Sequence, residues 1–264
     1  MSKHITLIVF GDVVARLGRS TLAAVVPLWR KKYKPDLVVA NVENLAHGRG
    51  VTLKTLDELQ KIGIDAFTGG NHVWTKESPL ELMQEHHLAV PANDPRTPID
   101  KALVKVPCGD QALFVLNLQG TIFMNDDSVE NPFLHFDKVV AGKPLPLLVD
   151  LHAEATSEKV AFGHYVDGRA SLVVGTHTHI PTADAKILPK GTGYITDIGM
   201  TGSDDSVLGV NKEIIIKRFT GEAKEIFDYP EHGPAIANAI LATIDMTTGH
   251  CTTIEHISHK LIIK

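Results

Sequence analysis

The chain has 264 residues, of which 44% are hydrophobic and 22% are charged, and its formal net charge at pH 7 is -5. This composition is enough for one well-filled core, and because no linker interrupts the sequence we expect a single domain over residues 1–264. The acidic balance argues against direct nucleic-acid binding, because that function usually needs a basic surface.

The first element is the apolar run at residues 5–10, which we predict to be a β-strand. It is too short for the core of a signal peptide or for a membrane span, so we expect a cytoplasmic protein that does not enter a membrane. A helix is predicted over 19–33, where apolar residues recur at every third or fourth position, and Pro35 marks its end.

The first half of the chain continues to alternate between strands and helices. Strands are predicted at 37–40 and 65–67, and helices at 53–62 and 79–87. Gly63 is placed where a glycine commonly ends a helix.

From residue 102 onward the pattern becomes richer in strands. Residues 102–106 and 112–118 predict an antiparallel hairpin. The segment 119–142 is predicted to be an irregular loop. Its apolar and aromatic residues could form a subunit contact, a lid or part of the core, and on this basis we favour a homo-oligomer. The residues concerned include Phe123, Met124, Phe133 and Phe136.

The remaining elements complete the pattern. A strand at 146–151 leads to a helix at 157–166, for which Thr156 or Ser157 offers a hydroxyl cap, and then to a strand at 171–174. Further strands are predicted at 187–188, 194–196 and 213–219, followed by a terminal hairpin that turns at 247–249. The chain is therefore predicted to be an α/β (α+β) protein with two packed sheets flanked by helices.

Polar side chains follow several of the predicted strands. In open α/β sheets, ligands bind outside the carboxyl ends of the strands, so these side chains have the right placement for one shared site. The histidines at 177 and 179 lie two residues apart in an extended segment or at its end and can face the same pocket. The candidate residues are Asp12, Glu43, Asn44, Asn71, His72, His152, His177 and His179.

Each of these residues also has an ordinary structural explanation. Asp12 could cap the turn into the next helix, and Glu43 and Asn44 could be turn residues. Their joint occurrence in this order favours a single working site. Arg16, Arg19, Lys159 and Arg169 could contact a substrate, although solvation at the surface is the commoner role for such side chains.

The order of these motifs resembles that of the calcineurin-like metallophosphoesterases. The longer runs resemble the bacterial YmdB-type branch of that superfamily, and they span residues 11 to about 210. The sequence departs from the branch at Ala15 and Val42, where glycine is expected, and at Thr75, where an acidic residue is usual. The matching runs are 11–14, 43–44, 70–74, 152–159, 175–179 and 194–202.

The resemblance implies a four-layer αββα sandwich of the metallophosphoesterase type with two metal ions. By position in the motifs, Asp12 and His179 would hold one ion, and Glu43 would bridge it to the second. Asn44 would be an additional ligand and His72 the catalytic histidine. The second ion would be held by Asn71, His152 and His177.

The chemistry of these side chains agrees with such a site. The two cysteines, Cys108 and Cys251, lie far apart, so the ligands must be nitrogen and oxygen atoms. This ligand set suits two divalent or trivalent ions, with Fe or Mn favoured and Zn possible. Two metals activate a bridging water and stabilise an in-line displacement at phosphorus, and His72 is then available as a general acid.

We therefore predict a metal-dependent phosphodiesterase that acts on small phosphodiesters. The resemblance implies cyclic nucleotides as substrates, either 2',3'-cyclic or 3',5'-cyclic. One alternative is a regulatory or RNA-associated scaffold whose di-metal site is structural or sensory. Another is a mononuclear hydrolase of the amidohydrolase type, in which the His-x-His pair belongs to the first strand, whereas this chain carries it at 177–179.

Overall fold

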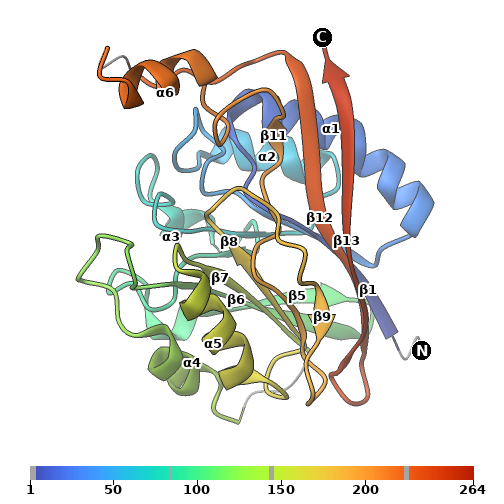
Figure 1. The fold of residues 1–264 in the computed structure, drawn as a ribbon. Helices are drawn as coiled ribbons and strands as arrows, with labels where there is room; N and C mark the ends of the chain where they lie inside the picture. The colour runs from blue at the N-terminus through green and yellow to red at the C-terminus, as the bar shows by residue number, and fades with distance from the viewer. Residues whose placement is uncertain (1–3, 84, 143–145, 223–225) are drawn as a thin grey trace.

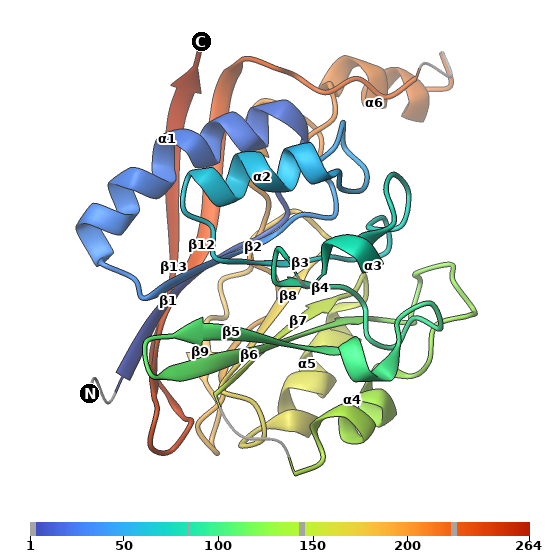
Figure 2. The same ribbon diagram turned by 180° about the vertical axis from the view of Figure 1, so that it is seen from behind.

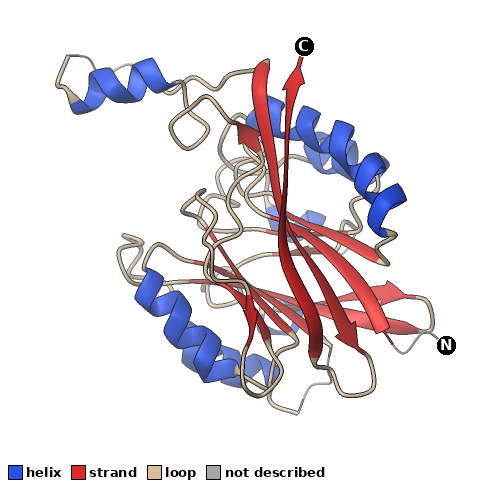
Figure 3. Ribbon diagram, turned by 45° about the vertical axis from the view of Figure 1, so that its right-hand side comes forward, coloured by secondary structure: helices blue, strands red, loops and turns tan. Residues whose placement is uncertain are grey.

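Two mixed β-sheets pack face to face, and helices cover the outer face of each sheet (Figure 1, Figure 3). The computed structural model describes residues 4–83, 85–142, 146–222 and 226–264. The prediction of an α/β chain with two packed sheets is confirmed.

Within the residues described, the first sheet has seven strands and combines parallel with antiparallel pairing. They are β1 (His4–Phe10), β2 (Leu37–Asn41), β3 (Ala66–Thr68), β4 (Leu88–Ala89), β11 (Gly202–Ser203), β12 (Gly233–Asp245) and β13 (Cys251–Ile263). Their order is β11-β12-β1-β2-β3-β4, with β13 paired to β12. Strands β1 to β4 are parallel, whereas β12 is antiparallel to β1, β11 and β13.

The second sheet has six strands in the part of the chain that the structure describes. They are β5 (Leu103–Cys108), β6 (Gln111–Gln119), β7 (Leu147–His152), β8 (Leu172–Thr176), β9 (Lys186–Ile187) and β10 (Gly193–Ile195). Their order is β5-β6-β7-β8-β10-β9. The four central strands are parallel, and the two outer strands are antiparallel to their neighbours.

The helices form the outer layers. They are α1 (Ala15–Tyr33), α2 (Leu53–Lys61), α3 (Pro79–Leu82), α4 (Pro132–Val140), α5 (Thr156–Val166) and α6 (Lys212–Phe219), with a 3-10 turn at Ile99–Lys101. Figure 2 shows α1 and α2 side by side over the first sheet, and α4 and α5 against the second. Helix α6 extends away from both sheets (Figure 1). Among the described residues, no helix combines the length and the apolar character that a membrane span needs.

Three apolar layers hold these elements together. The layer between the sheets includes Val9 and Val39 from the first sheet and Val115 from the second, all fully buried. On the outer side of the first sheet, Trp29 of α1 stacks on Phe10 of β1 with ring centroids 5.2 Å apart. Burial of these side chains is the main favourable contribution to folding, at about 25 cal/mol per Å² of apolar surface.

Two predicted elements are wrong in type. The predicted loop at 119–142 contains α4, which begins where the Asn131 side chain accepts hydrogen bonds from the N–H groups of Phe133 and Leu134. The predicted strand at 213–219 is α6, where Asn211 accepts from the N–H of Glu213. In both cases an asparagine cap satisfies a free N–H of the first turn and so favours a helix.

Other predictions need smaller corrections. The helix predicted over 79–87 ends at Leu82, because the chain turns through His87, with φ +48°, to add β4 beside β3. Helix α5 has Ala155 at its N-cap, so neither predicted hydroxyl caps it. In the segment 119–142, which was predicted as a loop, Met124 and Phe136 are buried, whereas Phe123 is 78% exposed. The core interpretation therefore holds for two of these residues.

Candidate metal centre

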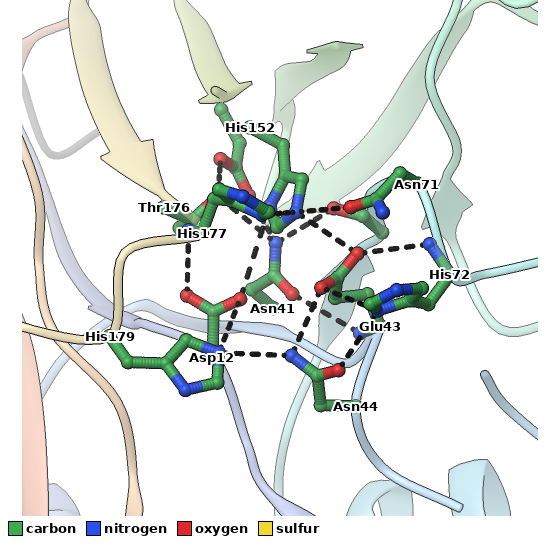
Figure 4. A network of polar contacts seen from close by, with 12 residues as sticks. Asp12, Asn41, Glu43, Asn44, Asn71, His72, His152, Thr176, His177 and His179 are labelled. Carbon is green, nitrogen blue, oxygen red and sulfur yellow. Dashed lines mark hydrogen bonds and ion pairs between the residues drawn. The ribbon is translucent and has the colours of Figure 1, made fainter. Parts of the chain in front are cut away.

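Five strand ends from the two sheets meet at one rim of the sandwich. Figure 4 shows that their polar side chains point toward one another. Asp12, Glu43 and His152 are at most 1% exposed, whereas His177 and His179 are partly accessible. Residues as far apart in the sequence as Asp12 and His179 thus form one cluster, as the motif pattern predicts. The strands that end here are β1, β2 and β3 of the first sheet and β7 and β8 of the second.

Glu43 lies at the centre of the cluster. Its Oε2 atom is 3.0 Å from Nε2 of His152 and accepts a hydrogen bond from the backbone N–H of His72 at 3.1 Å. Its Oε1 atom accepts from the side-chain amide of Asn44 at 3.0 Å. Ligand atoms of Glu43, His152 and His177 all lie within 4.8 Å of one another. Such a buried group of one carboxylate and two imidazoles could hold a metal ion.

Each of the three histidines directs one ring nitrogen into the cluster and binds an acceptor with the other. Metal-binding histidines in proteins have this arrangement, because the outer acceptor fixes the tautomer and the ring orientation. The outer acceptors are Thr176 Oγ1 at 2.8 Å for His152, Glu154 Oε2 at 3.1 Å for His177 and the Leu208 carbonyl at 3.0 Å for His179. The inner nitrogens of His152 and His177 lie 3.0 Å apart, whereas that of His179 lies beside Asp12 at 3.7 Å.

The polar atoms inside the cluster are incompletely satisfied by one another. Oδ2 of Asp12 accepts from the N–H of His177 at 3.1 Å, but its buried Oδ1 has no hydrogen-bond partner among the described residues. Nε2 of His152 has three polar neighbours at 3.0 Å, but it carries at most one hydrogen and cannot donate a full hydrogen bond to each of them. A cation would satisfy these lone pairs, so the residues present fit a metal. The three neighbours are Glu43 Oε2, Asn71 Oδ1 and His177 Nδ1.

The electrostatics of the cluster separate the histidines. Burial opposes the charged form of Glu43, but the charges and hydrogen bonds of His152 and His72 together outweigh it and hold the pKa of Glu43 well below its usual value. Burial also disfavours charge on His152, yet Glu43 raises the pKa of His152 to about 9. Burial and the charge of His152 lower the pKa of His177 to about 3. His177 is thus neutral at pH 7, whereas His152 would have to release a proton to bind a metal.

A further buried carboxylate ties the two sheets together beneath the cluster. Asp150 of β7 accepts from Thr176 Oγ1 at 2.7 Å and, across the interface between the sheets, from Asn41 at 2.9 Å and Thr68 at 2.5 Å. Burial raises the pKa of Asp150 to about 6. This residue was not predicted from the sequence, although it lies two positions before His152 in a strand and therefore on the same face.

A buried ion pair was also not predicted from the sequence. Lys159 is 1% exposed, and its Nζ donates to Asp197 and to the Thr176 carbonyl, both at 2.7 Å. Asp197 in turn accepts from the hydroxyl of Thr178 at 2.8 Å. The expectation of a solvated surface lysine is therefore wrong, because α5 places this side chain inside the fold.

This ion pair supports a strained loop. His177 and His179 have φ angles of +97° and +66°, a region that non-glycine residues rarely adopt. Thr178 lies between them and is held by Asp197, and the N–H of Met200 donates to the His179 carbonyl at 3.0 Å. We infer that Lys159 and Asp197 act as positioning residues for the two histidines.

The remaining candidates lie at the edge of the cluster. His72 Nδ1 is 3.3 Å from both Glu43 Oε1 and Asn44 Oδ1, and the side chain is 25% exposed. Asn44 turns its amide NH2 toward Glu43 and His179, so to act as a ligand it would have to turn its carbonyl oxygen inward. Ala15 has φ +52°, which explains why glycine suits this position.

A cavity of about 380 Å³ opens in front of the cluster. His72, Glu43, His177 and His179 form part of its wall, so the ring of His72 and the candidate ligands face the same space. A volume of this size admits a small organic ligand.

Comparison with known proteins gives matches over nearly the whole chain. Residues 8–257 match the model of the family described as YmdB-like protein. A protein of Bacillus subtilis named 2',3'-cyclic-nucleotide 2'-phosphodiesterase is 44% identical over 95% of this chain and 96% of its own length. A putative phosphatase/phosphodiesterase of Mycoplasma genitalium is 34% identical over 96% of this chain and 92% of its own length.

Two crystal structures have similar folds. One is a phosphatase of Mycoplasma pneumoniae, with a TM-score of 0.90 and 32% identity, covering 100% of this chain and 95% of that one. The other is a hypothetical protein of Thermus thermophilus, with a TM-score of 0.88 and 36% identity, covering 97% of this chain and 99% of that one.

Gly70 offers a test of the cluster that leaves the ligands unchanged. A Cβ atom at this position would lie 2.2 Å from Glu43 Oε2 and 2.6 Å from His152 Nε2. We expect Gly70→Ala to displace both side chains and to lose bound metal, measured by elemental analysis after reconstitution with manganese. The control is Gly202→Ala, whose methyl group approaches only Val14 at 3.3 Å. A Gly70→Ala protein with the full metal content would contradict the assignment.

The buried ion pair predicts a large stability effect. We expect Asp197→Asn to lower the free energy of unfolding of the metal-free protein by about 3–5 kcal/mol, because it leaves Lys159 charged and unpaired. The matched control is Asp137→Asn, which breaks the exposed pair with Arg169, whose side chain is 44% exposed. That change should cost at most about 1 kcal/mol. Urea denaturation measures the free energy of unfolding of both variants. Equal losses of stability would show that Lys159 does not need Asp197 as its partner.

Proposed function

The chain belongs to the YmdB-like protein family, and we propose that it is a metal-dependent phosphodiesterase that hydrolyses small cyclic phosphodiesters. The observation that carries the proposal is the convergence of Glu43, His152 and His177 at a cavity that also exposes His72. The layer order of helices, sheet, sheet and helices supports assignment to the metallophosphoesterase type, with residues 1–264 as one domain.

We assign two metal ions to this site. Asp12 and His179 would hold one, while Asn71, His152 and His177 would hold the other. Glu43 is suited to bridge them because its two carboxylate oxygens face different neighbours, Oε2 toward His152 and Oε1 toward Asn44. The nitrogen and oxygen donors favour Fe or Mn, with Zn as an alternative. When bound, such ions activate a water molecule and offset negative charge on the phosphoryl oxygens.

His72 is assigned the role of general acid. Its imidazole faces the cavity, and contacts from Nδ1 to Glu43 and Asn44 hold the ring at the edge of the cluster. Hydrolysis adds the elements of water across one phosphorus–oxygen bond of the ring. The hydroxyl group goes to phosphorus, and the proton donated by His72 goes to the ribose oxygen that leaves.

The substrate class is inferred from a relative. The Bacillus subtilis protein, 44% identical over 95% of this chain, is named for 2',3'-cyclic nucleotides. This supports 2',3'-cyclic over 3',5'-cyclic nucleotides as the substrates of this chain.

A substrate panel tests the proposal directly. Protein reconstituted with manganese is incubated with 2',3'-cyclic AMP, 3',5'-cyclic AMP and bis(4-nitrophenyl) phosphate, and products are separated by chromatography. We expect 2',3'-cyclic AMP to be opened fastest and chelation to abolish turnover. If none of the three is hydrolysed while metal is confirmed in the protein, the phosphodiesterase proposal is wrong and a structural or sensory metal site becomes the better account.

The general-acid role predicts a dependence on the leaving group. We expect His72→Ala to keep its metal and to lower kcat for 2',3'-cyclic AMP by about 10²- to 10⁴-fold, the usual contribution of general acid catalysis. The loss on bis(4-nitrophenyl) phosphate should be much smaller, because nitrophenolate leaves without a proton. His164→Ala, which removes an exposed histidine of α5, is the control. Equal losses on both substrates would contradict proton donation by His72.

A further inference from the structure

The cavity in front of the cluster has two chemically different walls. One wall consists of the candidate metal-binding and acid residues. The other is apolar and comes from residues between 207 and 219, where α6 lies, and from Phe227 and Tyr229. Its members include Leu208, Val210, Ile215, Phe219, Phe227 and Tyr229.

Hydrogen bonds and side-chain packing hold the apolar wall beside the cluster. The Leu208 carbonyl accepts from Nδ1 of His179 at 3.0 Å, so one residue of the wall directly holds a candidate ligand. Val207 and Val210 pair with each other through two backbone hydrogen bonds of 2.9 and 3.0 Å. Tyr229 packs so closely on Gly48 that a Cβ atom there would lie 2.0 Å from its ring. A group bound at the cluster is therefore placed beside these apolar side chains.

Two aromatic side chains of this wall are exposed. Phe219 is 85% exposed and Phe227 is 38% exposed, and the Arg218 guanidinium lies 4.3 Å from the centroid of the Phe227 ring. Apolar surface of this kind beside a polar centre is typical of a ligand site, where the polar groups fix orientation and the apolar groups supply area.

From these observations we propose that the apolar wall is the subsite for the nucleobase of the substrate. The inference rests on the proposed function, because the phosphate must lie at the metal cluster for the base to reach Phe219 and Phe227. A base has two π faces and stacks on aromatic rings, whereas the phosphate is charged and the ribose carries hydroxyl groups. The cavity of about 380 Å³ spans both walls.

The proposal also specifies the selectivity. Stacking on aromatic and aliphatic side chains tolerates every base, because each base has a π face. The subsite should therefore distinguish a nucleotide from a base-free phosphate ester much better than it distinguishes one base from another.

Binding measurements on the metal-loaded protein test the subsite without relying on turnover. Calorimetry compares adenosine 3'-phosphate, uridine 3'-phosphate and base-free 1-O-methylribose 3-phosphate. We expect the dissociation constants of the two nucleotides to be at least about tenfold lower than that of the base-free ester. The two nucleotides should differ from each other by less than about tenfold. The double variant Phe219→Ala/Phe227→Ala should lose about tenfold in nucleotide affinity and nothing for the base-free ester. Leu134→Ala, 61% exposed on α4, is the control.

Two results would overturn the subsite. One is equal affinity of the native protein for nucleotides and the base-free ester. The other is a double variant that keeps its nucleotide affinity. If this variant also has a changed sedimentation coefficient, the apolar wall is a contact between copies of the chain.

Kinetics separate this failure from failure of the proposed function. Hydrolysis of base-bearing and base-free 2',3'-cyclic phosphates with equal kcat/KM would leave the phosphodiesterase in place and exclude the subsite. Nucleotide binding that depends on Phe219 and Phe227, without hydrolysis of any phosphodiester, would keep the subsite and exclude the enzyme.

Discussion

The structure of the site depends on how the chain satisfies the buried carboxylate of Glu43. Glu43 is 1% exposed, and a buried charge destabilises the fold unless it is paired and hydrogen-bonded. The partners of Glu43 come from separate strand ends. His152 approaches from the second sheet, while Asn44 and the N–H of His72 approach from the first. The two sheets must therefore meet in one register, and the buried Asp150 network across their interface holds that register.

Two further contacts connect this cluster to the interior of the fold and to the cavity. The loop after β8 carries His177 and His179 in strained backbone conformations, and the buried pair of Lys159 and Asp197 holds it from behind. In front, His179 binds the carbonyl of Leu208 and so connects the cluster to the apolar side of the cavity. Loss of the Lys159–Asp197 pair or of the hydrogen bond between His179 and Leu208 would therefore alter both the cluster and the surface on which we place the base.

Much of this organisation could be predicted from the sequence, because apolar runs that end in polar residues reveal where strands stop. That pattern alone predicts that Asp12, Glu43 and His152 lie at one rim. Helix α6 was predicted as a strand, since a short apolar run fits either element and its Asn211 cap was not recognised. The burial of Lys159 could not be predicted, because it depends on a partner 38 residues later in the chain.

The central proposal is that Glu43 would bridge two metal ions at this rim. Anomalous diffraction at the manganese edge, from crystals of the reconstituted protein, tests it most directly. We predict two peaks, one beside Asp12 and His179 and one beside His152 and His177, with Glu43 contacting both. A single peak, or peaks beyond the reach of Glu43, would contradict the account.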